Sequence, residues 1–328
     1  MYKSLPHKTK QIFFVLTKLA IIVGAFYFIY QKIGQNDQIS FSTFLGQLRD
    51  TIFQNPINLL ILVGLSSLNW IFESFKWQKL SSFIKKNDLF NAFKQATASL
   101  TVSLFTPNRI GEYGAKALYY RKGFRRKIML LNLIGNGQQL LITLIIGAIG
   151  LYSLFTHYEI AIEYYALKRM SYIVLVLLLT TLFTTQLKGR KYQGFYIDRI
   201  VKFTKAFPKK VLIQTLVLSL VRYLVFSFQY YYLLHISGVE ITYFTAMMFI
   251  SSMYLVASFV PSFSFFDWVI KGSVAVWVFG FYPVDELLII SISLLMWILN
   301  FAFPAAIGSY YVLSFNLPKA YPSNIGKI

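Results

Sequence analysis

Long apolar stretches alternate with short charged segments along this chain, and this pattern predicts a bundle of membrane-spanning helices. A helix needs about 17 to 25 mostly apolar residues to cross the hydrocarbon core of a bilayer. Six stretches meet this length, and each is expected to be a full span: residues 12–30, 57–75, 128–152, 171–187, 210–235 and 287–313. The predicted fold is therefore an all-α, polytopic membrane helix bundle.

Two further apolar regions, residues 95–120 and 243–282, each contain a proline that interrupts a helix. Pro107 lies in the first region and Pro261 in the second, and Gly111 adds another helix-disturbing residue to the first. Each region is expected to form a re-entrant hairpin or a pair of short helices. Either form returns the chain to the side from which it came, so the topology of the six spans does not depend on the choice.

The composition supports a membrane protein and one domain. Of 328 residues, 56% are hydrophobic and 13% are charged, and the mean hydropathy is +0.57, which is well above the balance of a soluble domain. The longest polar segment is under about thirty residues, too short for a separate soluble domain. Residues 1–328 are therefore expected to form a single integral membrane domain. Because the chain has no cysteine, disulfides and thiolate metal sites are excluded.

The distribution of charge orients the predicted spans. Five segments together hold 24 Lys and Arg residues and two acids, and the four segments that alternate with them hold four Lys and Arg residues and seven acids. Since basic loops stay in the cytoplasm, both termini are expected on the cytoplasmic side of the cell membrane. The basic segments are residues 1–11, 76–95, 113–127, 188–210 and 314–328.

The net charge of +20 could also indicate nucleic-acid binding. The basic runs at 121–127 and 188–210 lie directly beside predicted spans, however, where such residues enforce topology and attract anionic headgroups at about 1 kcal/mol each. Nucleic acid is therefore not an expected partner. Residues 78–94, with apolar side chains among lysines, are expected to form an amphipathic helix at the membrane surface.

Seven ionisable residues remain inside the apolar stretches, where each is costly unless it is paired or faces water. Two of them, Lys18 and Glu73, lie near span ends, from which their side chains can reach the surface. Arg222 lies midway along its span and is expected to pair with an acid or to contact an anionic substrate group. The seven are Lys18, Glu73, Arg109, Glu112, Arg222, Asp267 and Lys271.

The two interrupted regions share a second feature, an acid followed four residues later by a base. Glu112 precedes Lys116 in the first region, and Asp267 precedes Lys271 in the second. This order is favourable on a helix, and a helix that starts after the break also attracts anions. The first hairpin is predicted to enter from the cytoplasm and the second from outside, an inverted pair of the kind found in alternating-access transporters. The alternative is that the prolines and ion pairs only lock the bundle.

The sequences around Pro107 and Pro261 resemble two motifs in the membrane region of lysylphosphatidylglycerol synthases and their stand-alone, flippase-like relatives. Residues 107–112, with the basic helix that follows, resemble the first motif of that family, and residues 261–273 resemble the second. In the second motif, Phe265 and Phe266 stand where the family usually has a glycine-rich stretch, and Asp267 and Lys271 are conservative departures. The resemblance extends over about 300 residues and implies a domain of about eight helices.

In function, the resemblance implies movement of an anionic or aminoacylated lipid, or of a polyprenyl-linked glycolipid, between leaflets. The aminoacyl transfer of that family belongs to a separate cytoplasmic domain, so this chain is not expected to have that activity. Four bases are predicted to contact the headgroup, and two acids are predicted to hold these bases or to contact a substrate amine. The bases are Arg109, Lys116, Arg222 and Lys271, and the acids are Glu112 and Asp267.

Other chemistry is less well supported by the sequence. The three histidines share no metal-ligand spacing, and no metal or cofactor is expected. Gly135 and Gly137 form part of a dinucleotide motif, but they lie inside a span, where close helix packing with hydrogen bonds from Asn136 and Gln138 is the better interpretation. An intramembrane enzyme that acts on a lipid phosphate or a lipid-linked sugar is the main alternative, and a scaffold is a third. A homo-oligomer is left open.

Overall fold

The structure is a computed structural model that describes residues 55–106, 109–158, 206–259 and 267–316. It also describes the isolated residues Leu16, Gly46 and Phe203 and the backbone of two short strands. Apart from Leu16, the predicted spans 12–30 and 171–187 lie outside the described residues. Pro107 and Pro261 also lie outside them.

The described residues fold almost entirely into helices, as the sequence predicts, together with one antiparallel pair of two-residue strands. The bounds in chain order are α3 (Pro56–Ser81), α4 (Leu89–Ser103), α5 (Ile110–Leu118), η2 (Lys122–Phe124), α6 (Arg125–Tyr158), β1 (Lys191–Tyr192), β2 (Phe195–Tyr196), α9 (Lys209–Ile236), α10 (Tyr243–Phe259), α11 (Asp267–Phe279), α12 (Glu286–Trp297), η3 (Ile298–Ala302) and α13 (Phe303–Leu313).

Within the described residues, four helices are long and apolar enough to cross a membrane: Pro56–Ser81, Lys122–Tyr158, Lys209–Ile236 and Glu286–Leu313. Each contains one of the predicted spans. The last is continuous through α12, η3 and α13, with η3 forming a π-helical turn in the middle. These helices have the length and composition of membrane-crossing segments.

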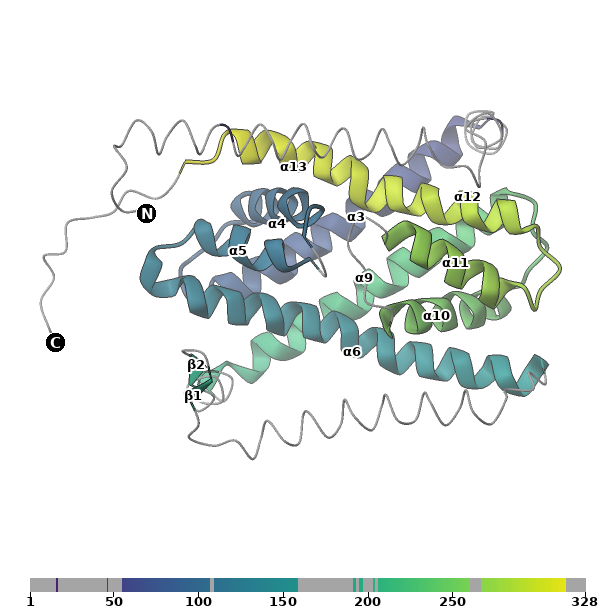
Figure 1. Cartoon of the computed structure of the whole chain (residues 1–328), viewed down its shortest axis with the longest axis horizontal. Helices are drawn as coiled ribbons and strands as arrows, with labels where there is room; N and C mark the ends of the chain where they lie inside the picture. Colours follow the sequence, from purple (N-terminus) through teal and green to yellow (C-terminus); the bar gives the residue numbers. More distant parts are fainter. Residues whose placement is uncertain are drawn as a thin grey trace, which may run out of the picture.

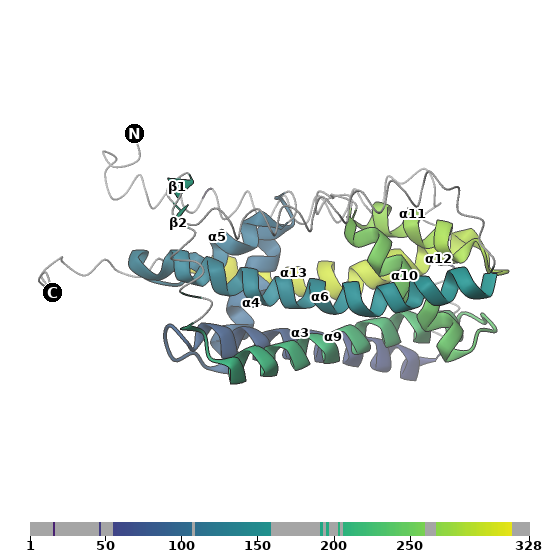
Figure 2. The ribbon, with the colours of Figure 1, turned by 90° about the horizontal axis from the view of Figure 1, so that it is seen from below.

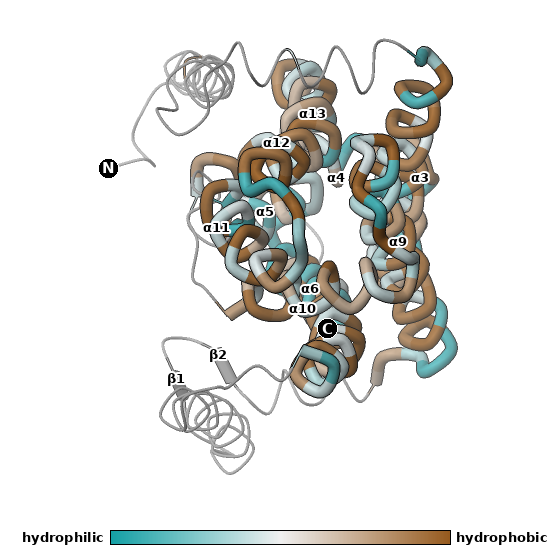
Figure 3. The backbone as a smooth tube through the Cα atoms, turned by 90° about the vertical axis from the view of Figure 1, so that its right-hand side faces the viewer, coloured by the Kyte–Doolittle hydropathy of each residue, from teal (hydrophilic) through white to brown (hydrophobic). Residues whose placement is uncertain are grey.

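Hydrophobic residues predominate along the helices of the bundle (Figure 3), and many of them are exposed on its outside. In the most apolar windows of α6 and α9, only 22% of the residues are buried inside the protein, although the mean hydropathy of both windows is 1.9. Leu60, Ile149 and Ile213 are more than half exposed on the outer faces of three different helices. An apolar surface of this extent suits contact with lipid rather than with water.

Two pairs of shorter helices occupy opposite ends of the bundle (Figure 1). Helices α6 and α12–α13 run along its two long edges, and between them α4 and α5 lie toward one end and α10 and α11 toward the other. Helices α3 and α9 pack side by side in a second layer (Figure 2). Helix α10 also packs along α6, and α13 packs along α4. Both interrupted regions of the sequence are therefore pairs of helices with a break between them.

Local capping signals explain where several helices begin. Asn55 accepts a hydrogen bond from the backbone amide of Ile57, and Pro56 occupies the first turn of α3. Asp88 caps α4 by accepting from the amide of Asn91. The predicted amphipathic helix over residues 78–94 is therefore wrong, because α3 continues to Ser81 and the cap at Asp88 starts a new helix.

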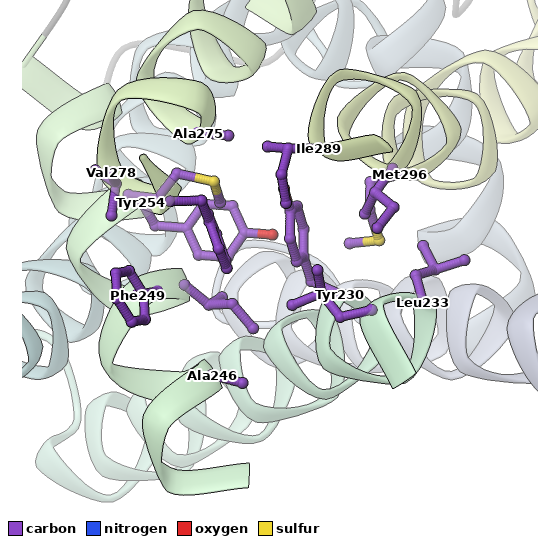
Figure 4. Close-up of a cluster of buried hydrophobic side chains, with 14 of the residues drawn as sticks. Tyr230, Leu233, Ala246, Phe249, Tyr254, Ala275, Val278, Ile289 and Met296 are labelled. Atoms are coloured by element: carbon purple, nitrogen blue, oxygen red, sulfur yellow. The ribbon is translucent and has the colours of Figure 1, made fainter. Parts of the chain in front are cut away.

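The largest buried hydrophobic cluster joins α9, α10, α11 and α12 (Figure 4). Tyr230 and Leu233 come from α9, Phe249 from α10, Val278 from α11 and Ile289 from α12. The rings of Phe249 and Phe279 stack with centroids 5.2 Å apart. This cluster fixes the second helix pair against the long helices at its end of the bundle.

Glycines allow two helix pairs to approach closely. A Cβ added at Gly150 on α6 would overlap the Ser251 hydroxyl of α10, and one added at Gly308 on α13 would overlap the Thr97 carbonyl oxygen of α4. The predicted packing role of the residues near position 135 is confirmed for three of the four. Gly135 would meet Leu80, Asn136 donates to the Tyr113 hydroxyl, and Gln138 donates to the Leu212 carbonyl, whereas Gly137 has open space around it.

Replacing Gly308 with alanine is expected to destabilise the protein by about 1 to 3 kcal/mol, the usual cost of overpacking. The reason is that the Thr97 carbonyl belongs to the backbone of α4 and cannot move aside alone. The thermal unfolding midpoint of the purified protein in detergent measures the effect. Gly137→Ala is the matched control, since nothing lies within 4 Å of its added Cβ, and it should leave the midpoint unchanged or raise it. Equal midpoints for the two variants would contradict the close packing of α13 on α4.

Candidate functional site

The start of α5 has an unusual backbone that places Arg109 beside the helix. Arg109 has a φ of 56°, a left-handed conformation that costs a residue with a side chain about 1 to 3 kcal/mol. Residues held in such conformations cluster at functional sites. Gly111 was predicted to break the helix, but it lies inside the first turn of α5, so this prediction is wrong. Its missing side chain instead leaves room for Thr106, whose hydroxyl accepts a hydrogen bond of 2.8 Å from the Gly111 amide.

Both predicted acid and base pairs form. Glu112 lies 2.7 Å from the ammonium of Lys116 on α5, and Asp267 lies 2.8 Å from that of Lys271 on α11. Glu112 also holds Arg109 at 3.0 Å. The first pair is almost completely buried, whereas the side chains of the second are about one quarter exposed. The four-residue spacing therefore predicted the pairs correctly.

Glu73 on α3 links the first pair to the long helices. Its carboxylate is paired with Arg222 of α9, with Lys76 at 2.8 Å and with Lys116 at 3.7 Å. Arg222 thus pairs with an acid inside the bundle, as predicted. The expectation that Glu73 reaches the membrane surface is wrong, because α3 continues for two further turns beyond it and its side chain is only 9% exposed.

A chain of buried amides extends from Arg222 to the π-helical turn. Arg222 donates to Asn69 at 3.0 Å, and Asn69 donates to Asn300 at 3.0 Å. Asn300 in turn donates to Gln229 at 2.8 Å, and Gln229 donates to the backbone carbonyl of Leu62 at 2.9 Å. Because each of the three amide side chains both accepts and donates, this series of hydrogen bonds fixes the position of the guanidinium.

The π-helical turn explains why two carbonyls near Asn300 face α3. Phe303 donates to the Ile298 carbonyl, one residue further back than in an α-helix, and Pro304 has no amide hydrogen to donate. The carbonyls of Leu299 and Asn300 thus lose their helical partners. Ser66 and Trp70 of α3 replace them, with hydrogen bonds of 2.6 Å and 3.0 Å. Such turns occur frequently at functional sites.

A cavity of about 570 Å³ lies between the two helix pairs. It is lined by the end of α4 and the start of α5 in the first pair, and by the end of α10 and the start of α11 in the second, which we call the broken ends of the pairs. Ser103 and Leu104 line it from the first pair, and Ala257 and Ser258 line it from the second. Its volume is in the range of pockets that bind small molecules. Six charged side chains line it: Glu73, Arg109, Glu112, Arg222, Asp267 and Lys271.

Phe301, in the π-helical turn, lies between the charged groups of the two helix pairs. The guanidinium of Arg109 is 5.9 Å from the centroid of its ring, and the ammonium of Lys271 is 5.0 Å from the same centroid. Both cations are within the range of a cation–π interaction. The ring therefore connects residues that are separated by more than 150 positions in the sequence.

Five of the six predicted binding residues line this cavity, and Lys116 does not. Lys116 is buried behind the wall, where it bonds to Glu112 and to Asn132 and lies 4.4 Å from the centroid of a ring of Trp77. In the structure, Lys116 contacts Glu73 and Glu112, two acids that line the cavity, and does not line the cavity itself.

Sequence reasoning missed several residues of the site on α3. Asn69, Glu73 and Lys76 follow one another at spacings of four and three, which places them on one helix face. That spacing is a usable signal, but the predicted span ends at residue 75, which leaves Lys76 in the basic segment 76–95. Tyr223 and Tyr254, which also line the cavity, carried no comparable signal.

The fold and the site together define a class: an all-helical bundle with an apolar outer surface and a charged cavity inside it. Comparisons with family models, with curated proteins and with solved structures found no match to this chain. The resemblance to flippase-like membrane proteins therefore stays a prediction.

Proposed function

We propose that this chain is a multi-pass membrane protein that moves a lipid with an anionic headgroup, or a lipid-linked glycan, from one leaflet to the other. The observation that carries the proposal is the charged cavity that both helix pairs share at their broken ends. Ionised groups are tolerated inside a membrane where they pair or face a polar cavity, and such places mark substrate paths. The proposal agrees with the function that the flippase-like resemblance implies.

The proposed topology has six full spans and two re-entrant helix pairs. Four spans are the long helices, and residues 12–30 and 171–187 supply the other two. The excess of Lys and Arg in alternate loops supports cytoplasmic termini. With this orientation, α4 and α5 enter from the cytoplasm and α10 and α11 from outside, so that their broken ends meet near the middle. This inverted arrangement is the one used by transporters that open alternately to the two sides.

The chemistry of the cavity supports an anionic headgroup. Arg109 and Arg222 each present a planar guanidinium that can bond two oxygens of one phosphate at once. Lys271 adds a third cation from the opposite helix pair. Glu112 and Asp267 hold two of these bases, Arg109 and Lys271, in place, and either acid is also suited to a substrate amine.

Lipid transfer in vesicles tests the proposal. The full chain is reconstituted with a fluorescent phosphatidylglycerol, and a reagent that quenches only the outer leaflet reports how fast lipid crosses. We expect Arg109→Ala, Lys271→Ala and Glu112→Gln each to slow transfer about tenfold or more, since hydrogen bonds to charged groups contribute about 1.5 to 3 kcal/mol. Lys86→Ala, at an exposed position, is the control.

Transfer at the wild-type rate in all three variants would mean that the cavity is not the site. The same vesicles address the alternative of an intramembrane enzyme. Chemical conversion of a lipid phosphate or a lipid-linked sugar, with no transfer between leaflets, would support that alternative and contradict transport.

A further inference from the structure

The charges around the cavity do not balance. Among the described residues, three bases and three acids line it, and two further lysines, Lys76 and Lys116, lie fully buried directly behind it. The cluster thus has an excess of two positive charges. Elsewhere in the apolar stretches the sequence has one more ionisable residue, Lys18, and its positive charge cannot reduce this excess.

The excess lies on one side of the cavity. Asp267 and Lys271 neutralise each other on the side of the second helix pair. On the other side, two carboxylates are shared by four bases. The carboxylates are Glu73 and Glu112, and the bases are Lys76, Arg109, Lys116 and Arg222.

Of these four bases, only the two arginines face the cavity. The side chains of Arg109 and Arg222 are 42% and 18% exposed, whereas those of Lys76 and Lys116 are at most 2% exposed. An anion in the cavity would therefore bond to the arginines. The lysines would remain as counter-ions of the carboxylates, so that the arginines can turn to the anion without leaving a buried acid unpaired.

Two tyrosines that line the cavity have buried hydroxyls. Tyr223, next to Arg222 in the sequence, and Tyr254 on α10 both line the cavity and are at least nine-tenths buried. Within the described part of the chain, neither hydroxyl has a hydrogen-bond partner. A buried hydroxyl without a partner is costly, and phosphoryl oxygens are strong acceptors.

We infer that the occupant of this cavity carries at least two negative charges on phosphoryl groups, as a lipid diphosphate or a fully ionised lipid phosphate monoester does, and not the single charge of a phospholipid diester. A dianion makes the cluster neutral, whereas a monoanion leaves one buried charge without compensation. That the occupant is a lipid rests on the proposed function. That its headgroup is a dianion rests on the charges that line the cavity and lie directly behind it.

Native mass spectrometry of the purified full chain tests this inference. The protein is mixed with equal amounts of dioleoylglycerol diphosphate, dioleoyl phosphatidylglycerol and dioleoyl phosphatidylcholine, which share their acyl chains. We expect the diphosphate lipid to occupy the protein about tenfold more than phosphatidylglycerol, which corresponds to about 1.4 kcal/mol. Equal or greater occupancy by phosphatidylglycerol would overturn the inference.

Lysine variants show whether the buried charges set this preference. Lys76→Met and Lys116→Met each remove one positive charge. In each variant, the diphosphate lipid and phosphatidylglycerol should therefore occupy the protein to nearly the same extent. Lys86→Met makes the same change at an exposed position and should leave the preference unchanged. A full preference in a folded Lys76→Met or Lys116→Met protein would contradict the charge assignment. Should both variants fail to fold, the wild-type comparison still decides the inference.

Two further results separate this inference from the proposed function. If inorganic diphosphate displaces the diphosphate lipid at equal concentration, the dianion assignment stands and the lipid assignment fails. If the protein prefers the diphosphate lipid but moves no lipid in vesicles, transport fails and the headgroup assignment stands. If it moves phosphatidylglycerol faster than the diphosphate lipid, transport stands and the headgroup assignment fails.

Discussion

Replacing Glu73 with glutamine is expected to cost about 3 to 5 kcal/mol of stability, the usual effect of removing one partner from a buried ion pair. The carboxylate is the shared counter-ion of Lys76, Lys116 and Arg222, and two of these three bases are fully buried. The amide of glutamine has a similar shape but no charge, so the variant isolates the electrostatic contribution. The thermal unfolding midpoint of the purified protein in detergent is the measurement.

Two further variants make this test specific. Glu286→Gln removes an acid from an exposed position on α12 and should leave the midpoint within the error of the wild type. Glu73→Gln combined with Lys76→Met removes one charge of each sign and should recover part of the loss. A Glu73→Gln protein that unfolds at the same temperature as Glu286→Gln would show that Glu73 does not hold the cluster together.

Replacing Arg222 with glutamine is expected to slow lipid transfer about tenfold to a hundredfold while leaving the protein folded. The loss follows from the charge-assisted hydrogen bonds, each worth about 1.5 to 3 kcal/mol, that the guanidinium would make to a phosphate. The fold is spared because Glu73 keeps Lys76 and Lys116 as counter-ions. The vesicle assay measures the transfer rate, and unfolding in detergent checks the fold.

Arg222→Lys separates charge from shape. Lysine keeps the positive charge but loses the planar fork and the hydrogen bond to Asn69 that positions it. Its transfer rate should therefore lie between those of the wild type and Arg222→Gln. Lys86→Gln, an exposed change of the same charge, is the control. If folded Arg222→Gln protein moves lipid as fast as Lys86→Gln, then Arg222 does not contact the substrate.

The long helices could be predicted from the sequence because their signal is local. A mostly apolar stretch longer than about 17 residues admits few structures other than a spanning helix, and the stretch at 210–235 differs from α9 by one residue at each end. The broken helix pairs were predictable for a similar reason, since proline and charge interrupt each apolar region. Their acid and base pairs followed from helical spacing alone.

The full site was harder to predict because it depends on contacts between distant segments. Glu73 can hold the cluster together only because α3 extends to Ser81 and packs beside α9. Neither feature can be predicted from a window of about twenty residues. Lys76 and Lys116 belong to the basic segments that predict the orientation, and the prediction does not depend on them, because 22 bases remain in those segments without them. Their position in the sequence gives no indication that they are buried beside the cavity.

The sequence signal for the π-helical turn is a proline. Pro304 lies inside an apolar span, and it removes the helical partner of the Asn300 carbonyl four residues earlier. A proline and a buried amide at this spacing indicate that a neighbouring helix must supply hydrogen bonds. The identity of that neighbour, α3 with Ser66 and Trp70, came only from the structure.

The central claim is that the broken ends of the two helix pairs meet at one cavity inside the membrane. The chain has no cysteine, so Tyr113→Cys on α5 and Ser258→Cys at the end of α10 would introduce the only thiols at two cavity-lining positions. Vesicles containing the double variant are treated with a short bifunctional thiol reagent, and the joined peptides are identified by mass spectrometry. Our account predicts that the two positions are joined and that lipid transfer then stops, whereas each single variant stays active under the same treatment. Thiols that both react but are never joined would contradict it.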